Sequence, residues 1–308
     1  MKNRVGGHMN FFSKLLARCK ENHVKKISVV VCAQEDELLK AILRAEREGI
    51  ITSPILVGDR EEIVKHLLQN GANLDEYQII HGEGKEKCSE MAVQSILSGA
   101  GDFLVKGLVD TSIILKAILN KKEELSKSEN GEIFFSHVTV AELDVIDRVI
   151  VFGDAAMNIL PDVETKIKII ENCYSVWNAL HLGTPKIALL AAKESVSKKM
   201  IATLDAQIIT QNLSLDERFI VEGPLALDNA LSKKSAEIKG ISGKIQGDAD
   251  ILIMPNIEAG NIFYKSLCYL TKSETAGILV GAKVLVVITS RADDEESKFL
   301  SIVLASVI

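Results

Sequence analysis

The pair Ser290-Arg291 directly follows the apolar run 284–289. A guanidinium can donate two parallel hydrogen bonds to a phosphate or a carboxylate, and the serine hydroxyl supplies a further donor. The pair therefore has the chemistry to bind a phosphoryl group or a developing oxyanion. Taken alone, however, an arginine in this place is more often an exposed residue that pairs with acidic neighbours, and the segment 293–296 is acidic throughout.

Polar residues also follow other apolar runs, each at the point where the run ends. They are Thr111 with Ser112, Asp154 with Asn158, Asp228 with Asn229, and the segment 256–261. In open parallel α/β sheets, ligands bind outside the carboxyl ends of the strands, so these residues are candidates to line an anion-binding edge. The alternative for Thr111 and Ser112 is capping of the helix that follows them, which is the more common role of such hydroxyls.

The stretch 249–265 combines these features most clearly. A continuous apolar run closes at Pro255, a short turn carries Asn256 and Glu258, and an amphipathic segment begins at Gly260. This order predicts a buried strand, a loop and a helix. The start of such a helix also offers unpaired backbone N–H groups to an anion.

The elements that must position these residues alternate along the chain. The pattern predicts strands at 27–33, 54–59, 77–80, 103–107, 134–144, 148–154, 185–191, 220–225, 249–254 and 284–291. It predicts helices at 35–43, 63–68, 91–97, 113–119, 165–180, 260–270 and 295–307. Because strands and helices alternate with short loops, we expect an α/β fold with largely parallel sheets and helices on both faces.

Composition and charge exclude several classes of protein. At 308 residues, the chain is long enough for two domains or one large α/β unit. The net charge of −6, without a basic block, argues against nucleic acid as a partner. No apolar stretch is long enough for a membrane helix, and the amino terminus has no leader pattern, so we expect a cytoplasmic protein that does not bind membranes. Five scattered cysteines indicate free thiols.

The common catalytic motifs are absent from the sequence. No G-x-S-x-G, G-x-x-x-x-G-K-[ST] or G-x-G-x-x-G pattern follows a predicted strand, which argues against a serine hydrolase, a P-loop enzyme and a typical dinucleotide dehydrogenase. The six histidines and the cysteines show no spacing of metal ligands. We therefore expect no metal site.

Five sequence blocks together resemble one known family. The blocks are 106–112, 154–158, 223–230, 255–261 and 289–293, and they occur in order along most of the chain from about Lys26 onward. As a set they are similar to the phosphate acetyl/butyryltransferase family, and specifically to its phosphate butyryltransferase branch. Any one block alone would be a weak signal.

The resemblance implies reversible acyl transfer, in which acyl-CoA and phosphate give acyl phosphate and CoA without a metal or a bound organic cofactor. It also implies two three-layer α/β domains with an interdomain cleft, in a fold shared with isocitrate and isopropylmalate dehydrogenases. We expect the first domain at 1–146 plus 278–308 and the second at 147–277. A homo-oligomer is usual in such families.

The resemblance also assigns roles to particular residues. Arg291 would hold the phosphoryl group, and Ser290 would orient the carbonyl group or the CoA sulfur. The other residues expected to bind phosphate or CoA around the cleft are Thr111, Ser112, Lys116, Asn158, Asn229, Glu258, Asn261 and Lys265.

Two departures from the acetyltransferase pattern affect these roles. The presumed base of the acetyltransferases is an aspartate, whereas the corresponding position here is Ser297, so the candidate bases are the nearby Asp293, Asp294 and Glu296. Lys116 stands where an arginine is expected, and lysine keeps the charge but loses the bidentate geometry. This second departure favours a butyryl-like substrate over acetyl.

Three alternatives remain open beside a butyryl-transferring enzyme. The first is a phosphate acetyltransferase. The second is a metal- and NAD-dependent dehydrogenase on the same scaffold, for which Asp228 and Asp250 alone supply too few metal ligands. The third is a non-catalytic paralogue that binds acyl-CoA, and the intact Ser290 and Arg291 argue against it.

Overall fold

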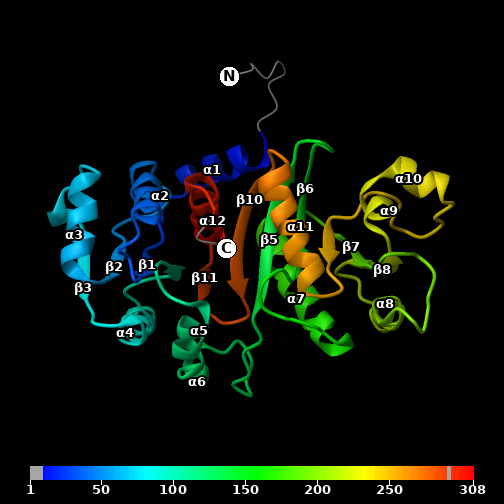
Figure 1. Cartoon of the computed structure of the whole chain (residues 1–308), viewed down its shortest axis with the longest axis horizontal. Helices are drawn as coiled ribbons and strands as arrows, with labels where there is room; N and C mark the ends of the chain where they lie inside the picture. Colours follow the sequence, from blue (N-terminus) through cyan, green and yellow to red (C-terminus); the bar gives the residue numbers. More distant parts are fainter. Residues whose placement is uncertain (1–9, 290–292) are drawn as a thin grey trace, which may run out of the picture. The chain divides into compact units, whose positions relative to one another are not determined.

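The computed structural model of this chain describes residues 10–289 and 293–308 (Figure 1). Its contacts divide the chain into two compact units. The first unit takes in Met1–Ile133 and Ala282–Val307, and the second takes in Phe134–Gly281 with Ile308. Among the described residues, no helix combines the length and the apolar character that crossing a bilayer requires.

The sheet of the first unit is parallel throughout its described strands. Their order is β3 (Gln78–His81), β2 (Ile55–Gly58), β1 (Ser28–Val31), β4 (Phe103–Lys106) and β11 (Leu285–Val287). β1 is rich in β-branched residues and is buried along its whole length between two neighbours. β11 pairs with β4, so a strand from near the end of the chain lies in a sheet begun near its start.

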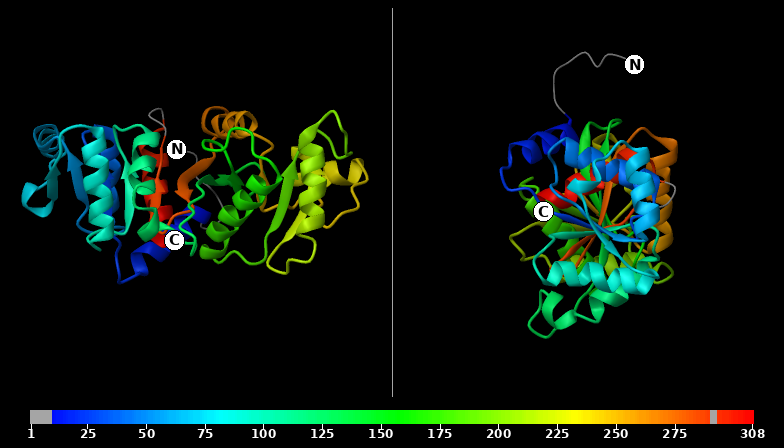
Figure 2. Two further views of the ribbon diagram at one scale, coloured as in Figure 1. Left: turned by 90° about the horizontal axis from the view of Figure 1, so that it is seen from below. Right: turned by 90° about the vertical axis from the view of Figure 1, so that its left-hand side faces the viewer.

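Different helices cover the two faces of this sheet (Figure 2). α2 (Asp36–Arg47) and α12 (Glu295–Val307) pack against each other, and α1 (Phe11–Glu21) packs on α12. α4 (Lys85–Leu97) packs on β1, β2 and β4 and contacts α5 (Thr111–Leu119). Burial on both faces explains why β1, β2 and β4 read as continuous apolar runs.

The sheet of the second unit mixes antiparallel and parallel pairs. Its order is β10 (Glu274–Val280), β5 (Ser136–Leu143), β6 (Arg148–Gly153), β9 (Ile251–Ile253), β7 (Lys186–Leu190) and β8 (Ile220–Leu225). β5 is antiparallel to β10 and to β6, whereas β6, β9, β7 and β8 are parallel. The carboxyl ends of these four parallel strands therefore meet at one edge of the sheet.

The two faces of the second sheet are buried by different helices. α11 (Ile257–Leu270) and α9 (Leu227–Leu231) share an apolar cluster with strand residues such as Phe152 and Leu252. Gly153 follows Phe152 and faces the opposite side, where α7 (Val163–Ala179) places Ile169 and Cys173 against it. Successive strand residues alternate between the faces, so both layers of helices are needed to cover the sheet.

The expected α/β class with largely parallel sheets is confirmed, but several elements were not predicted, among them α8 and β10. α8 (Ile201–Asn212) has a weakly segregated apolar face, which gives little helical pattern in the sequence. β10 contains Ala276 and Gly277, residue types that are uncommon in strands. It is stabilised instead by antiparallel pairing with β5 along its whole length.

The boundaries of the units differ from the expected divisions after residues 146 and 277. A division after 146 would separate β5 from β6, although these strands pair from Thr139 opposite Phe152 to Leu143 opposite Arg148. A division after 277 would cut β10 in two. Backbone hydrogen bonds between strands hold β10, β5 and β6 in one unit.

Candidate active site

In the first unit, the chain segments after β4 and β11 begin at the same edge of the sheet. Leu285 lies opposite Phe103 and Val287 lies opposite Val105 in parallel register. The chain thus leaves β11 beside the end of β4, which leads to Thr111 through a short loop. The catalytic pair expected from sequence, Ser290 and Arg291, lies outside the described residues.

Thr111 and Ser112 are the first two residues of α5 and not its cap. The N-cap is Asp110, whose carboxylate makes an ion pair with Lys85 at 3.1 Å and gives no side-chain cap to the helix. The hydroxyls of Thr111 and Ser112 are therefore at a helix start, where backbone N–H groups lack helical partners. Lys116 lies in the last turn of α5 and is exposed, at the other end of this short helix.

The candidate bases have different environments. Asp294 accepts a hydrogen bond of 2.9 Å from the backbone N–H of Ser297 and so caps α12. Glu296 accepts two hydrogen bonds from the guanidinium of Arg44, at 2.5 and 3.3 Å, and this bonding raises the pKa of Arg44. Asp293 is buried. Asp294 and Glu296 thus help to hold α12 in place.

A buried lysine near the start of α12 was not anticipated from the sequence. The ammonium of Lys298 lies 2.9 Å from Glu35 and 3.3 Å from Glu37, and only 1% of its side chain is exposed. Burial acts to lower the pKa of Lys298, but the hydrogen bonds and charges of the two glutamates outweigh it and raise the pKa. The acidic segment 35–37 read only as the start of a helix, so the sequence carried no signal of this pair.

In the second unit, Asp154 organises the loop after β6. Its buried carboxylate accepts hydrogen bonds from the backbone N–H groups of His137, Ala156 and Met157, at 3.1, 2.7 and 2.9 Å. The side-chain amide of Asn158 donates to the same carboxylate at 2.6 Å and to the carbonyl of Phe135 at 3.0 Å. Asn158 is therefore committed to holding this loop.

The loop after β9 lies directly against the loop after β6, as expected for neighbouring parallel strands. Asn256 caps α11 by accepting a hydrogen bond of 3.0 Å from Ala259. The side-chain amide of Asn261 donates to the carbonyl of Ala155 at 3.2 Å. Gly260 approaches the backbone at Asp154 so closely that a Cβ atom would overlap its carbonyl oxygen.

The other predicted residues of α11 lie further along the helix or point to solvent. Glu258 is exposed in the first turn, where a carboxylate complements the helix dipole. Lys265 is half-buried, with its ammonium 4.9 Å from the ring centre of Tyr264 and 5.9 Å from that of Tyr269. The structure thus brings Asn158 and Asn261 to the same pair of loops, with Glu258 at their margin.

Asn229 connects α9 to the loop after β7. It is completely buried in α9, and its side-chain amide donates a hydrogen bond to Glu194. Glu194 belongs to the loop after β7 and was missed by the sequence analysis, because a glutamate next to a lysine, here Lys193, reads as a solvated residue. In this structure the side chain of Asn229 therefore holds the loop after β7.

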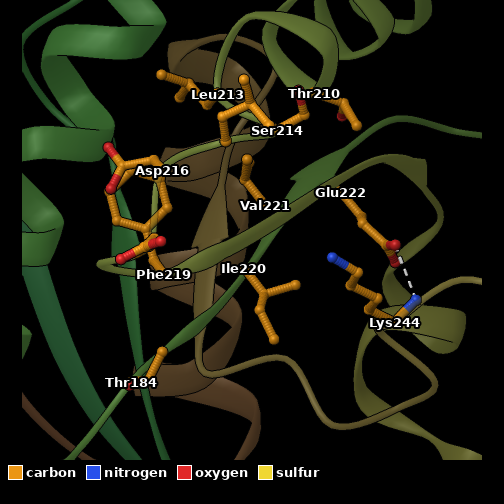
Figure 3. Close-up of a pocket in the computed structure, with 12 residues that line it drawn as sticks. Thr184, Thr210, Leu213, Ser214, Asp216, Phe219, Ile220, Val221, Glu222 and Lys244 are labelled. Atoms are coloured by element: carbon orange, nitrogen blue, oxygen red, sulfur yellow. Dashed lines mark hydrogen bonds between the residues drawn. The ribbon is translucent and has the colours of Figure 1, made fainter.

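The described structure also contains a cavity of about 550 Å³ in the second unit, beside β8 at the edge of the sheet (Figure 3). Its walls include Ile220 and Val221, and Glu222 accepts a hydrogen bond of 2.8 Å from the backbone N–H of Lys244. None of the site residues expected from the sequence lines this cavity. In residues 10–289 and 293–308, no group of three or more His, Cys, Asp or Glu side chains is gathered for a metal ion.

Comparison with known proteins gives a consistent result. A model of the phosphate acetyl/butaryl transferase family matches residues 87–306. Phosphate butyryltransferase from Clostridium acetobutylicum is 39% identical over 299 residues, which cover 96% of this chain and 97% of that protein. Phosphate acetyltransferase from Thermotoga maritima is 38% identical over 288 residues, covering 92% and 95%.

Solved structures show the same similarity. A branched-chain phosphotransacylase from Enterococcus faecalis is 33% identical and superposes with a TM-score of 0.80, covering 91% of this chain and 98% of that one. A putative 4-hydroxythreonine-4-phosphate dehydrogenase from Salmonella typhimurium, 12% identical, covers 92% and 99% with a TM-score of 0.56. This second likeness concerns the fold alone.

Proposed function

This chain belongs to the phosphate acetyl/butyryl transferase family, and we propose that it transfers a short acyl group, butyryl or a close analogue, between coenzyme A and inorganic phosphate. The observation that carries the proposal is the match with the clostridial phosphate butyryltransferase over nearly the full length of both chains. Phosphate acyl transfer is the activity of the family, and the preference for a butyryl-like chain is the part we propose.

The reaction requires an oxygen of phosphate to attack the thioester carbonyl. The carbon–sulfur bond then breaks, the acyl phosphate forms, and CoA leaves as a thiolate that takes up a proton. Arg291 would donate hydrogen bonds to the phosphate, and Ser290 would orient the carbonyl oxygen. Thr111 and Ser112, at the start of α5 on the neighbouring strand end, offer hydroxyl and N–H donors to the same anion.

The reverse direction needs a base to deprotonate the thiol of CoA. Glu296 is held by Arg44 and Asp294 caps α12. Of the three candidates, Asp293 stands nearest to Arg291 in the chain, and it is the candidate base that we carry forward. The other residues at the strand ends, Asn158 and Asn261, would shape the loops of the second unit that receive acyl-CoA.

A phosphate acetyltransferase is the second candidate, because the Thermotoga maritima enzyme is almost as similar as the clostridial one. Lys116 stands where the acetyltransferase pattern has an arginine, and this departure from that pattern favours the butyryl-like substrate. Both candidates share the same chemistry and differ in the acyl chain.

The first prediction is that the protein releases CoA from butyryl-CoA when inorganic phosphate is present. The release is measured by the colour reaction of the free CoA thiol. We expect a higher kcat/KM for butyryl-CoA than for acetyl-CoA. Arg291→Ala should lower kcat by roughly a hundredfold or more, as loss of an oxyanion donor does in other acyl transfers. The control Arg18→Ala, at an exposed position of α1, should leave the rate unchanged.

Absence of phosphate- or arsenate-dependent CoA release from every short acyl-CoA would overturn the proposal. Faster turnover of acetyl-CoA would retain the acyltransferase and reject the butyryl preference. Binding of acyl-CoA without turnover would identify the non-catalytic alternative.

A further inference from the structure

We propose that Glu194 is a positioning residue for the phosphate groups of coenzyme A, because it holds in place the loop that presents Lys198 and Lys199. This inference rests on the proposed function and identifies the part of the second unit that would meet the polyanionic end of the substrate. The loop runs from the end of β7 to the start of α8.

The first anchor of the loop is the carboxylate of Glu194. It accepts a hydrogen bond from the side-chain amide of Asn229 on α9 and another, at 3.2 Å, from the ammonium of Lys239. Asn229 is fully buried, and its amide oxygen lies 3.1 Å from the hydroxyl oxygen of Ser235. The carboxylate of Glu194 accepts hydrogen bonds, so the NH₂ group of the Asn229 amide is the end that faces it.

A second carboxylate completes this network. Asp228 accepts a hydrogen bond from Ser235 at 2.5 Å and lies 3.0 Å from the ammonium of Lys239. The hydrogen bond from Ser235, together with Lys239, lowers the pKa of Asp228. Lys239 thus bridges the carboxylates of Glu194 and Asp228, so the loop after β7 and the helices after β8 are tied together by charge-assisted hydrogen bonds.

The second anchor lies at the other end of the loop. The buried hydroxyl of Thr203, in the first turn of α8, accepts a hydrogen bond of 2.9 Å from the N–H of Ser197. The N–H of Met200 donates to the carbonyl of Ser197 at 2.9 Å and closes a tight turn. Lys198 and Lys199 form the exposed tip of this turn. Neither lysine makes an ion pair within the part of the chain that the structure describes.

The chemistry of this tip suits a phosphate-rich ligand. Coenzyme A carries a pyrophosphate and a 3′-phosphate far from its reactive thiol, and lysine ammonium groups bind phosphate as point charges. The loop follows β7, whose carboxyl end lies at the same edge as those of β9 and β6. The two lysines therefore stand at the edge where the loops with Asn158 and Asn261 would receive the substrate. The alternative is that Lys198 and Lys199 lie on an exposed turn that takes no part in binding coenzyme A.

The second prediction compares two substrates, butyryl-CoA and butyryl-pantetheine, which has the same thioester but no phosphates. Lys198→Ala with Lys199→Ala, and separately Glu194→Ala, should raise KM for butyryl-CoA about tenfold with little change in kcat, as loss of one or two charged hydrogen bonds predicts. The KM for inorganic phosphate and the kcat/KM for butyryl-pantetheine should stay unchanged. Glu194→Gln should restore much of the affinity, because its carbonyl can still accept from Asn229.

The matched control is Lys122→Ala, an exposed lysine of the first unit, which should have no effect. An equal loss for both substrates would indicate a purely structural role and overturn the inference, and so would unchanged kinetics of the double lysine variant. Calorimetric binding of CoA to the same variants tests the loop without turnover. If the wild-type protein binds CoA through this loop but transfers no acyl group, the proposed function fails while this inference stands.

Discussion

Two acidic residues near the start of α12 show that residue type and position alone do not identify a general base. Asp294 and Glu296 both follow the expected catalytic pair, yet the first caps the helix and the second holds Arg44. The guanidinium of Arg44 also lies 3.8 Å from the ring centre of Phe299, so the ion pair rests on an aromatic face. These carboxylates serve the packing of α12 on α2.

A third prediction follows for Glu296. Glu296→Gln should lower the free energy of unfolding by about 1 kcal/mol, a value that allows for solvent screening of this half-exposed pair. The pH dependence of kcat should keep its shape, since the side chain takes no proton from the substrate. Urea unfolding and a pH–rate profile measure the two effects, with Glu295→Gln as the control. Loss of the acidic limb of the profile would show that Glu296 is the base after all.

At the level of elements, the contact between α11 and the loop after β6 is the most restrictive feature of the second unit. Gly260 lies in the first turn of α11, where a Cβ atom would be 3.0 Å from the Cα atom of Ala155 and would overlap the carbonyl oxygen of Asp154. The close approach lets Asn261 reach the carbonyl of Ala155. A glycine is needed here for space, not for an unusual backbone angle.

The fourth prediction tests this contact. Gly260→Ala should destabilise the protein by about 1–3 kcal/mol, despite the higher helix propensity of alanine, because backbone atoms cannot move aside easily. It should also raise KM for acyl-CoA, since the loop that carries Asn158 must shift. Thermal unfolding and steady-state kinetics would be compared with Ser266→Ala, an outward-facing position of the same helix. A stabilised variant would contradict the packing argument.

At the level of the whole molecule, the five cysteines report on how completely both units are packed. Cys19, Cys32, Cys88 and Cys173 are buried free thiols, and Cys268 is partly exposed. Burial is the main cause, and the nearby Cys88 the next largest, that raises the pKa of Cys32 to about 12. Burial also raises the pKa values of Cys19, Cys88 and Cys173. Their reactive thiolate forms are therefore scarce at neutral pH.

The fifth prediction concerns the reactivity of these thiols. At pH 8, a thiol reagent such as Ellman's should modify Cys268 first and leave the four buried cysteines unmodified for much longer. In denaturing urea all five should react, because unfolding exposes the four buried thiols and returns their raised pKa values to the ordinary range. Cys268→Ser should remove the fast phase. Rapid reaction of all five in the native protein would contradict the packing of both units.

The amino-acid sequence by itself determined the α/β class, most strands and helices, and the family. These depend on local patterns such as the apolar run 249–254, the turn at Pro255 and the helix after it, which the structure reproduces as β9 and α11. The antiparallel β10 escaped detection because its stability comes from distant pairing with β5. Pairing partners far apart in the chain leave no local pattern.

Only the tertiary structure decided what each polar residue at the strand ends does. Three asparagines at these strand ends have the same side chain but different partners. Asn229 is completely buried against Glu194, and Asn158 is hydrogen-bonded to Asp154. Asn261 donates to the carbonyl of Ala155. Glu194 and Lys298 gained their roles from partners 35 or more positions away in the chain. Residue type sets which hydrogen bonds are possible, whereas burial and the direction of neighbouring groups select among them, and those depend on how the strands are ordered.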